Sequence, residues 1–505
     1  MAMNTIVMYV RLAITMVVTL ISSRWVLLAL GTEDFGIYNL VAGLLSMLMF
    51  LNLTMATASQ RFMSYAQGKN DPKLIKDSFY YSCILHLIVG IIIVACIEII
   101  GGIMLQTVLV VPEGKENLAF FCLHSLTIST FFTVISVPYR ALLISHENIV
   151  FIAIVEIATA VMKLLGAIVL LNYMGSRLKL YAVIMTAIPI ITVIIYRIFC
   201  HAKYEESRIQ LHKITDFTLF KSISSYAGWN LIGSVSCLLR TQGVSMLLNS
   251  FYGVAMNAAY GIASQVKGQV AHFSQSIVTS TRPQIVKSEG MGNRKRVHDL
   301  CAITCKLTFL LLSMLCIPLI VEMPYVLRLW LKIVPDYAVD FTTLILLDSM
   351  ILQFGIGVAI AIESVGRIKI LQIVVGGLEC IVLPIGYIML RLGMSPSSVF
   401  VMICIEELVG LFFRLLISKR ITELDVYGFI KSTIVPSVTI AILLYVGLHA
   451  LQQTMSEGFA RLVVMCLISV LFIPFAGYRF ALTQFEKEHV KTIFNGVLKK
   501  IHIKR

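Results

Sequence analysis

Apolar stretches of about 20 residues recur along the whole of this 505-residue chain, and they limit what it can fold into. A helix of that length crosses a hydrocarbon core about 30 Å thick. Only 13% of the residues are charged and 58% are hydrophobic, whereas about 25% of the residues in soluble domains are charged. The pattern predicts an all-α polytopic membrane protein of about fourteen transmembrane helices, with little chain left for a soluble domain.

The predicted transmembrane helices are the hydrophobic blocks between polar breaks. They cover residues 4–30, 36–65, 79–106, 117–139, 149–172, 178–199, 222–249, 253–281, 300–322, 341–364, 368–390, 397–417, 432–451 and 460–480. A short segment at 326–334 is interpreted as interfacial. The first block is interpreted as a retained helix and not as a signal peptide, because it is too long for a signal-peptide core and has no charge before Arg11.

The distribution of lysine and arginine predicts the orientation of the chain. With a cytoplasmic N-terminus, the segments on that side of the membrane contain 28 of these residues and the segments on the other side contain 7. Because cytoplasmic loops are enriched in lysine and arginine, we expect a multi-pass membrane protein with both termini in the cytoplasm. The net charge of +14 has the same explanation, so no nucleic-acid partner is expected.

A glycine-flanked hairpin and an internal repeat indicate how the helices are grouped. The stretch "LALGTEDFGIYNL" (28–40) places Glu33 and Asp34 between two glycines, which is typical of a tight outer turn. At an offset of 221 residues, "TASQRFMSYAQGKN" lies opposite "TSTRPQIVKSEGMGN", with Arg61 aligned with Arg282. Six predicted helices separate the two copies. An even number makes them parallel repeats.

The repeat predicts the domain organisation. We expect two six-helix lobes in a parallel pseudo-repeat, followed by two extra C-terminal helices. The boundaries are an N-lobe at 1–215, a C-lobe at 216–425, the extra helices at 426–480 and a basic cytoplasmic tail at 481–505.

The sequence contains no motif for nucleotide, metal or hydrolase chemistry. Walker, Rossmann, GxSxG and HExxH patterns are absent, so we expect a protein that is not an enzyme and has no cofactor. The eleven cysteines are scattered singly, apart from Cys301 and Cys305, which lie one helical turn apart without histidine or aspartate companions. No metal site is therefore expected.

Ionisable residues inside the predicted helices are the candidates for function, because each is costly to insert into a membrane. The candidates for substrate binding are the cations Arg24, Arg61, Lys163, Arg240 and Lys267. The candidates for ion coupling are the acids Glu98, Glu156, Asp348 and Glu379, and two further acids are Glu406 and Glu407. Two alternatives stay open: cations near helix ends can extend to the headgroups, and Lys163, Arg240 and Lys267 can form structural ion pairs.

The segment "LISSRWVLLALGTEDFGIYNLVAGLLSMLMFLNLTMATASQRFMSYAQGK" resembles the N-terminal signature of O-antigen flippase-like lipopolysaccharide biosynthesis proteins. These form part of the multidrug/oligosaccharidyl-lipid/polysaccharide exporter (MOP) superfamily. The most specific part is G-x-x-x-[FY]-G-x-[YF] followed by S-Q-R-F. The resemblance implies two lobes around a central cavity lined by helices one, two, seven and eight. It also implies transport of undecaprenyl-diphosphate-linked oligosaccharide across the bacterial inner membrane, with the diphosphate bound by Arg24, Arg61, Arg240 and Lys267.

The resemblance also implies partners, and two other functions stay open beside it. The implied partners are the undecaprenyl-diphosphate-linked glycan, membrane lipids, and the glycan polymerase and glycosyltransferases of the same pathway. A drug or cation exporter of the same superfamily would need an acidic site, and residues 4–30 contain no aspartate or glutamate. A membrane-embedded polysaccharide polymerase or ligase would need a large outer loop, and the predicted outer loops are short.

Overall fold

The computed structural model describes residues 2–46, 49–107, 112, 114–208, 217–331, 334–483 and 486–487, and over these residues the chain is helical with no strand. The elements of the first half are α1 (Ala2–Ser46), α2 (Met49–Gly68), α3 (Pro72–Cys96), η1 (Ile97–Gly101), α4 (Gly102–Thr107), α5 (Glu116–Ser145), α6 (Ile149–Asn172), α7 (Arg177–Lys203), η2 (Glu205–Ser207) and α8 (Phe217–Tyr252). Those of the second half are α9 (Val254–Gly290), α10 (Arg294–Val321), α11 (Met323–Leu331), α12 (Ala338–Val365), α13 (Lys369–Arg391), α14 (Ser397–Ile421), α15 (Val426–Phe429), η3 (Ile430–Ile434), α16 (Val435–Thr454), α17 (Phe459–Ala476) and η4 (Gly477–Ala481).

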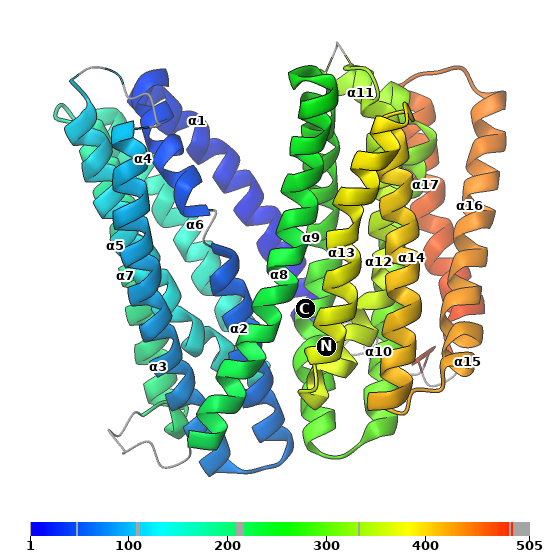
Figure 1. Ribbon diagram of the computed structural model, residues 1–505, viewed down its shortest axis with the longest axis horizontal. Coiled ribbons are helices and arrows are strands. Elements are labelled where there is room, and N and C mark those ends of the chain that lie inside the picture. The colour runs from blue at the N-terminus through cyan, green and yellow to red at the C-terminus, as the bar shows by residue number, and fades with distance from the viewer. Residues whose placement is uncertain are drawn as a thin grey trace, which may run out of the picture. The chain divides into compact units, whose positions relative to one another are not determined.

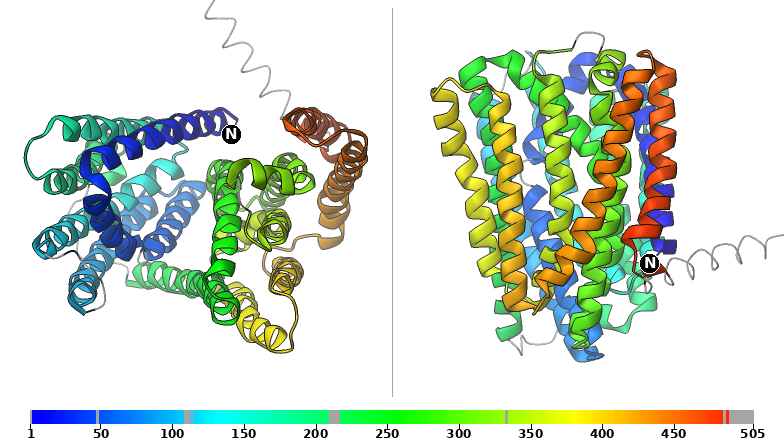
Figure 2. Two further views of the ribbon diagram at one scale, coloured as in Figure 1. Left: turned by 90° about the horizontal axis from the view of Figure 1, so that it is seen from above. Right: turned by 90° about the vertical axis from the view of Figure 1, so that its right-hand side faces the viewer.

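The chain divides into two compact units, each a bundle of helices (Figures 1 and 2). The N-terminal unit comprises Asn4–Leu231, and the C-terminal unit comprises Ile232–Arg505 with Met1–Met3. The boundary lies inside α8, so this helix begins in one unit and ends in the other.

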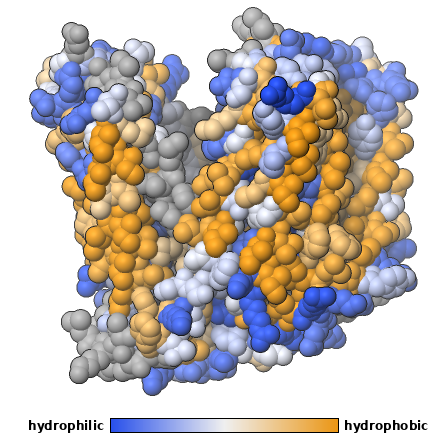
Figure 3. Space-filling model, viewed as in Figure 1, coloured by the Kyte–Doolittle hydropathy of each residue, from blue (hydrophilic) through white to orange (hydrophobic). Residues whose placement is uncertain are grey.

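The prediction of an all-α polytopic membrane protein is confirmed. Eleven helical stretches of the described chain are long and apolar enough to cross a membrane. The predicted spans at 36–65, 253–281 and 397–417 are helical over their described residues apart from Gly253, but none of them forms a separate stretch among these eleven. On the face shown in Figure 3, apolar side chains cover the middle of the helices and hydrophilic ones gather toward their ends, as the surface of a membrane protein requires.

The hairpin turn predicted at 28–40 and the turn between α8 and α9 have nearly the same backbone geometry. Gly31 separates the two helical parts of α1 at φ 75° and ψ 173°, and Gly253 separates α8 from α9 at φ 77° and ψ −169°. The turn before α3 repeats in the same way: Asp71 accepts a hydrogen bond from the amide of Leu74, and Asn293 accepts one from the amide of Arg296 at the start of α10. Both pairs, 31 with 253 and 71 with 293, are 222 residues apart.

The repeat is therefore present, but its predicted offset of 221 residues is wrong by one. The error came from aligning Arg61 with Arg282, which are one residue out of register in the helices that carry them.

Replacing Gly253 with alanine is expected to destabilise the protein by about 1–3 kcal/mol. The backbone region that Gly253 occupies is open essentially to glycine alone, so a side chain there stores strain. Thermal denaturation of the purified protein in detergent measures the effect. Gly261→Ala is the matched control, because Gly261 lies inside α9 with open space around its Cα, and alanine is the better helix former. Equal stability of both variants would contradict the prediction.

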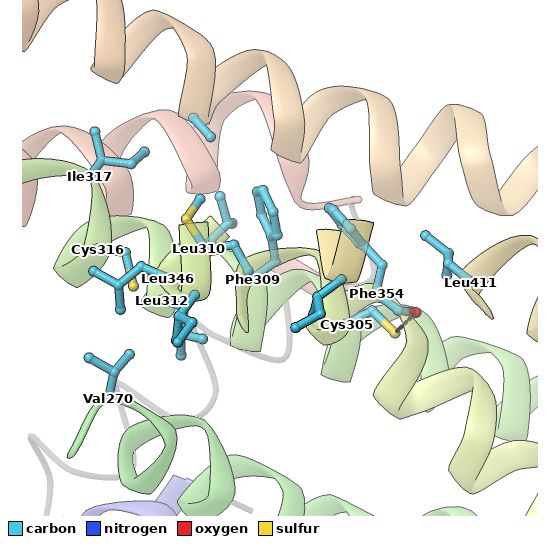
Figure 4. Close-up of a cluster of buried hydrophobic side chains, with 14 of the residues drawn as sticks. Val270, Cys305, Phe309, Leu310, Leu312, Cys316, Ile317, Leu346, Phe354 and Leu411 are labelled. Carbon is cyan, nitrogen blue, oxygen red and sulfur yellow. Dashed lines mark hydrogen bonds between the residues drawn. The ribbon is translucent and has the colours of Figure 1, made fainter. Parts of the chain in front are cut away.

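The apolar core of the C-terminal unit contains the closely spaced cysteines. Cys305 donates a hydrogen bond from Sγ to the carbonyl oxygen of Phe354 at 3.2 Å, and the ring of Phe354 stacks on Phe309 with 4.2 Å between centroids (Figure 4). A Cβ at Gly357 would lie 2.6 Å from the carbonyl oxygen of Cys301 and 2.7 Å from Sγ of Cys305. These cysteines therefore serve close packing of α10 against α12.

Candidate functional site

The N-terminal unit contains a polar cavity of about 380 Å³ between α5, α6 and α7. Its lining combines hydroxyl groups, charged groups and one face of α7, the helix that contains Pro189. The lining residues are Ser129, Thr133, Ser136, Arg140, Glu156, Thr159, Lys163, Met185, Ile188, Pro189, Thr192 and Tyr196. A cavity of this size with a few convergent polar groups is what a small-molecule or headgroup site requires.

The charged groups of this cavity are predominantly cationic. Glu156 on α6 accepts hydrogen bonds from Arg11 of α1 and, at 2.9 Å, from Arg140 of α5. Lys163 lies two turns further along α6 and makes no hydrogen bond or ion pair with the described residues. Three cations and one carboxylate therefore meet here, and Lys163 is the cation available to a ligand.

The hydroxyl groups are oriented as hydrogen-bond acceptors toward the cavity. Thr133, Thr159 and Thr192 each donate to a carbonyl oxygen of their own helix at 2.8–2.9 Å, which leaves the hydroxyl oxygen able to accept. Pro189 lacks the amide that would bond the carbonyl of Met185 in α7, and the hydroxyl of Ser129 donates to that oxygen at 3.3 Å. The carbonyl oxygen that Pro189 leaves free therefore accepts a hydrogen bond that links α5 to α7 beside the cavity.

The C-terminal unit contains a cluster of buried charges. Nη1 of Arg240 on α8 lies 2.6 Å from Oε2 of Glu406 and 4.0 Å from Oε2 of Glu407 on α14. Glu407 also pairs with Arg414 of the same helix. Nζ of Lys267 on α9 lies 2.7 Å from Oδ2 of Asp348 on α12, which is 3% exposed.

Glu379 gives this cluster an excess of one carboxylate. It lies on α13 within electrostatic range of Arg240 and Glu406. In the part of the chain that the structure describes it has no hydrogen bond or ion pair. The cluster thus has four carboxylates and three cations, with Glu379 as the one carboxylate that no cation contacts.

The predicted site residues therefore fall into several environments. Arg240, Lys267, Asp348 and Glu379 come together in the C-terminal cluster, and Glu156 and Lys163 line the N-terminal cavity. The ion pairs of Arg240 and Lys267 are those of the structural alternative, so their binding of substrate stays a prediction.

The remaining predicted residues lie outside both groups. Arg61 is buried, with its guanidinium 4.6 Å from the ring centroid of Phe62 and 4.8 Å from that of Tyr65. Arg24 is exposed. Glu98, in the π-helical turn η1, pairs with Nδ1 of His124 at 2.7 Å.

Sequence reasoning assigned Arg140, Arg282, Lys306 and Arg414 to cytoplasmic segments. In the structure these cations lie inside helices, and each pairs with a carboxylate. The helices α5 and α9 extend beyond the predicted spans 117–139 and 253–281 and include Arg140 and Arg282. The hydroxyl lining of the cavity was also missed, since serine and threonine are unremarkable in membrane helices.

Comparison with known proteins connects this arrangement to a class of transporters. The family model MatE matches residues 8–169. An outward-facing multidrug resistance MATE family transporter of the MOP superfamily is 14% identical, with a TM-score of 0.72 over 83% of this chain and 95% of that chain. A MATE protein in a bent conformation is 14% identical, with a TM-score of 0.68 over 86% of this chain and 96% of that chain.

A MOP superfamily transporter from Pyrococcus furiosus, described with a reversed polarity of its binding pocket that suggests a different function, is 13% identical. Its TM-score is 0.69 over 84% of this chain and 95% of that chain. No curated protein matches the chain. The MatE model thus matches part of the chain, and the chain has the fold of solved MATE transporters.

Proposed function

We propose that this protein is an exporter that works by alternating access. The support is the likeness of most of the chain to MATE transporters, together with polar sites inside both units. In such a mechanism a polar site faces one side of the membrane and then the other. The excess carboxylate Glu379 and its neighbour Asp348 are our candidates for binding the coupling ion, since intramembrane acids commonly do so.

Two classes of cargo are in question. The comparisons favour a drug or cation exporter over a flippase for lipid-linked oligosaccharide, because the matched structures include a multidrug resistance transporter. At 14% identity this likeness concerns the fold, and the polarity of the pocket is a property of each chain. The Pyrococcus furiosus protein illustrates the point, since its reversed pocket polarity is described as suggesting a different function.

The charge of the N-terminal cavity carries our proposal for the cargo. Arg11, Arg140 and Lys163 outnumber Glu156, so an organic cation would meet repulsion there, while a diphosphate would meet charge-assisted donors. The hydroxyl oxygens suit the many O–H donors of a glycan. We therefore propose a flippase for undecaprenyl-diphosphate-linked oligosaccharide, with the drug or cation exporter as the second candidate.

Transport in proteoliposomes distinguishes the two candidates. The purified protein should move a fluorescent lipid-diphosphate oligosaccharide across the bilayer and leave a fluorescent lipophilic cation in place. Lys163→Glu should lower the lipid-linked transport by about 10–100-fold, since a charge-assisted hydrogen bond of about 1.5–3 kcal/mol is lost. Lys179→Ala is the control, because Lys179 lies at the start of α7 against Phe121 and outside the cavity.

The opposite result selects the second candidate. Transport of the cation, unchanged transport of the lipid-linked glycan in Lys163→Glu, or faster cation transport in that variant would each support the drug or cation exporter.

A further inference from the structure

Between residues 59 and 86 of the N-terminal unit, on α2 and α3, six polar side-chain atoms are buried without a hydrogen-bond partner among the described residues. Ser59, Gln60 and Ser64 contribute Oγ, Nε2 and Oγ from α2, and Ser78, Ser82 and His86 contribute Oγ, Oγ and Nε2 from α3. Five of the six residues are 0% exposed, and Gln60 is 8% exposed. Buried polar atoms in proteins nearly always have a partner, either protein or ordered water.

The spacing groups these atoms on one face of each helix, and α2 and α3 both also pack against α5. Ser78, Ser82 and His86 lie on successive turns of α3, and Gln60 and Ser64 lie on successive turns of α2. The two helices pack against each other. A row of unsatisfied donors and acceptors along such an interface is where internal water is found, because water supplies the missing hydrogen bonds.

The row begins near the start of α3 and ends at an apolar contact. Ser78 lies within two turns of the exposed residues Pro72 and Lys73, where the helix begins. One turn beyond His86, a Cβ at Gly90 of α3 would lie 3.2 Å from Cδ2 of Phe131 on α5. The helices α3 and α5 are therefore in close apolar contact there. His86 is thus the last polar group of the row, about 21 Å along α3 from Pro72.

The hydrogen bond of His86 fixes which ring nitrogen can take a proton. Nδ1 lies 2.7 Å from the carbonyl oxygen of Ser82. A carbonyl oxygen only accepts, so Nδ1 carries the hydrogen and Nε2 of the neutral ring is a bare acceptor. Nε2 is the atom that has no partner within the described residues.

Charged groups on the helices around His86 are engaged elsewhere. On α2, Arg61 lies over the rings of Phe62 and Tyr65. On α5, His124 pairs with Glu98 and Arg140 pairs with Glu156, and Tyr139 contacts the ring of Phe79. In η2, which packs against α3, Glu206 pairs with His146. Among the described residues, no carboxylate contacts the ring of His86, so a proton held there would have to be solvated by the neutral polar groups and water of the row.

We propose that the interface of α2 and α3 holds a row of internal water molecules that ends at His86, and that Nε2 of His86 is a proton-binding site. Water that enters near the start of α3 then supplies both the hydrogen bonds that the row lacks and the proton. An intramembrane histidine in contact with water is a typical member of a proton relay.

The water can be tested on the unmodified protein by brief hydroxyl-radical footprinting, in which radicals formed from water oxidise adjacent side chains even when these are buried. We expect oxidation of His86. Met465 is the dry control, since it is 0% exposed in the apolar core and methionine is more easily oxidised than histidine. Protection of His86 equal to that of Met465 would overturn the proposal.

The proton is tested by nitrogen NMR of the histidine rings over about pH 5–8. The chain has ten histidines, and the signal that is lost in His86→Gln identifies this ring. We expect that signal to change with pH; a signal of the neutral ring at every pH overturns the proton-binding site, even if footprinting finds water. If His86→Gln fails to fold, footprinting of the unmodified protein still decides the water. Neither measurement uses a cargo, so both are independent of the proposed transport function.

Discussion

Arg240→Ala is expected to destabilise the protein by about 3–5 kcal/mol and to lower the amount of folded protein sharply. The guanidinium of Arg240 lies 2.6 Å from the carboxylate of Glu406, which is 6% exposed. Removal of the cation leaves that carboxylate charged and buried with no direct partner, and breaking a buried pair costs this much. Thermal denaturation in detergent and the yield of monodisperse protein measure the loss.

A second change and a matched arginine make this result specific. Arg240→Ala combined with Glu406→Gln should recover much of the stability, because no charge is then left alone. Arg391→Ala should change stability by less than about 0.5 kcal/mol, since Arg391 is exposed at the end of α13. If Arg240→Ala were as stable as the wild type but inactive in transport, Arg240 would be a cargo ligand, as the sequence suggested.

The hairpins and the repeat could be predicted because their signals are local. A glycine between two apolar blocks marks a turn, and Gly31 and Gly253 both adopt a backbone conformation that other residues avoid. The register of the repeat was harder to predict. Arg61 and Arg282 provided a visible match, but the helices are aligned by their caps at Asp71 and Asn293, which the pattern of charged residues does not reveal.

The intramembrane charges could be found in the sequence, but their partners could not. Arg240 and Glu406 are 166 residues apart, and Lys267 and Asp348 are 81 residues apart. Apolar periodicity indicates that a helix is present but not how it is rotated against helices from distant parts of the chain. Lys267 therefore lies against Asp348, and Glu379 is the acid of this cluster that no cation contacts among the described residues.

Neutral polar groups give the weakest sequence signal. His86 lies in the predicted span 79–106, where its single side chain hardly lowers the hydropathy of the block. Only the structure shows that its ring is 0% exposed and that one nitrogen has no partner among the described residues. The hydroxyl lining of the cavity is invisible for the same reason.

A buried ion pair also links α10 to the segment after η4. Nζ of Lys306, which is 1% exposed, lies 2.9 and 3.0 Å from the two carboxylate oxygens of Glu486. Glu486 is positioned by reciprocal bonds: its carboxylate accepts from the amide of Thr483 at 2.7 Å, and its own amide donates to the Thr483 hydroxyl at 3.3 Å. This is the capping-box arrangement, and it directs the carboxylate to the lysine.

Glu486→Ala is accordingly expected to destabilise the protein by about 3–5 kcal/mol, since it leaves the ammonium of Lys306 buried and alone. Glu457→Ala is the matched control: Glu457 also pairs with a cation, Arg328, but both side chains are about half exposed, and such pairs contribute about 0–1 kcal/mol. Combining Glu486→Leu with Lys306→Met should restore stability, because apolar groups of similar volume replace a buried pair without loss. If Glu486→Ala were no less stable than Glu457→Ala, water would have to reach Lys306, and the segment around Glu486 would contribute nothing to holding α10 in place.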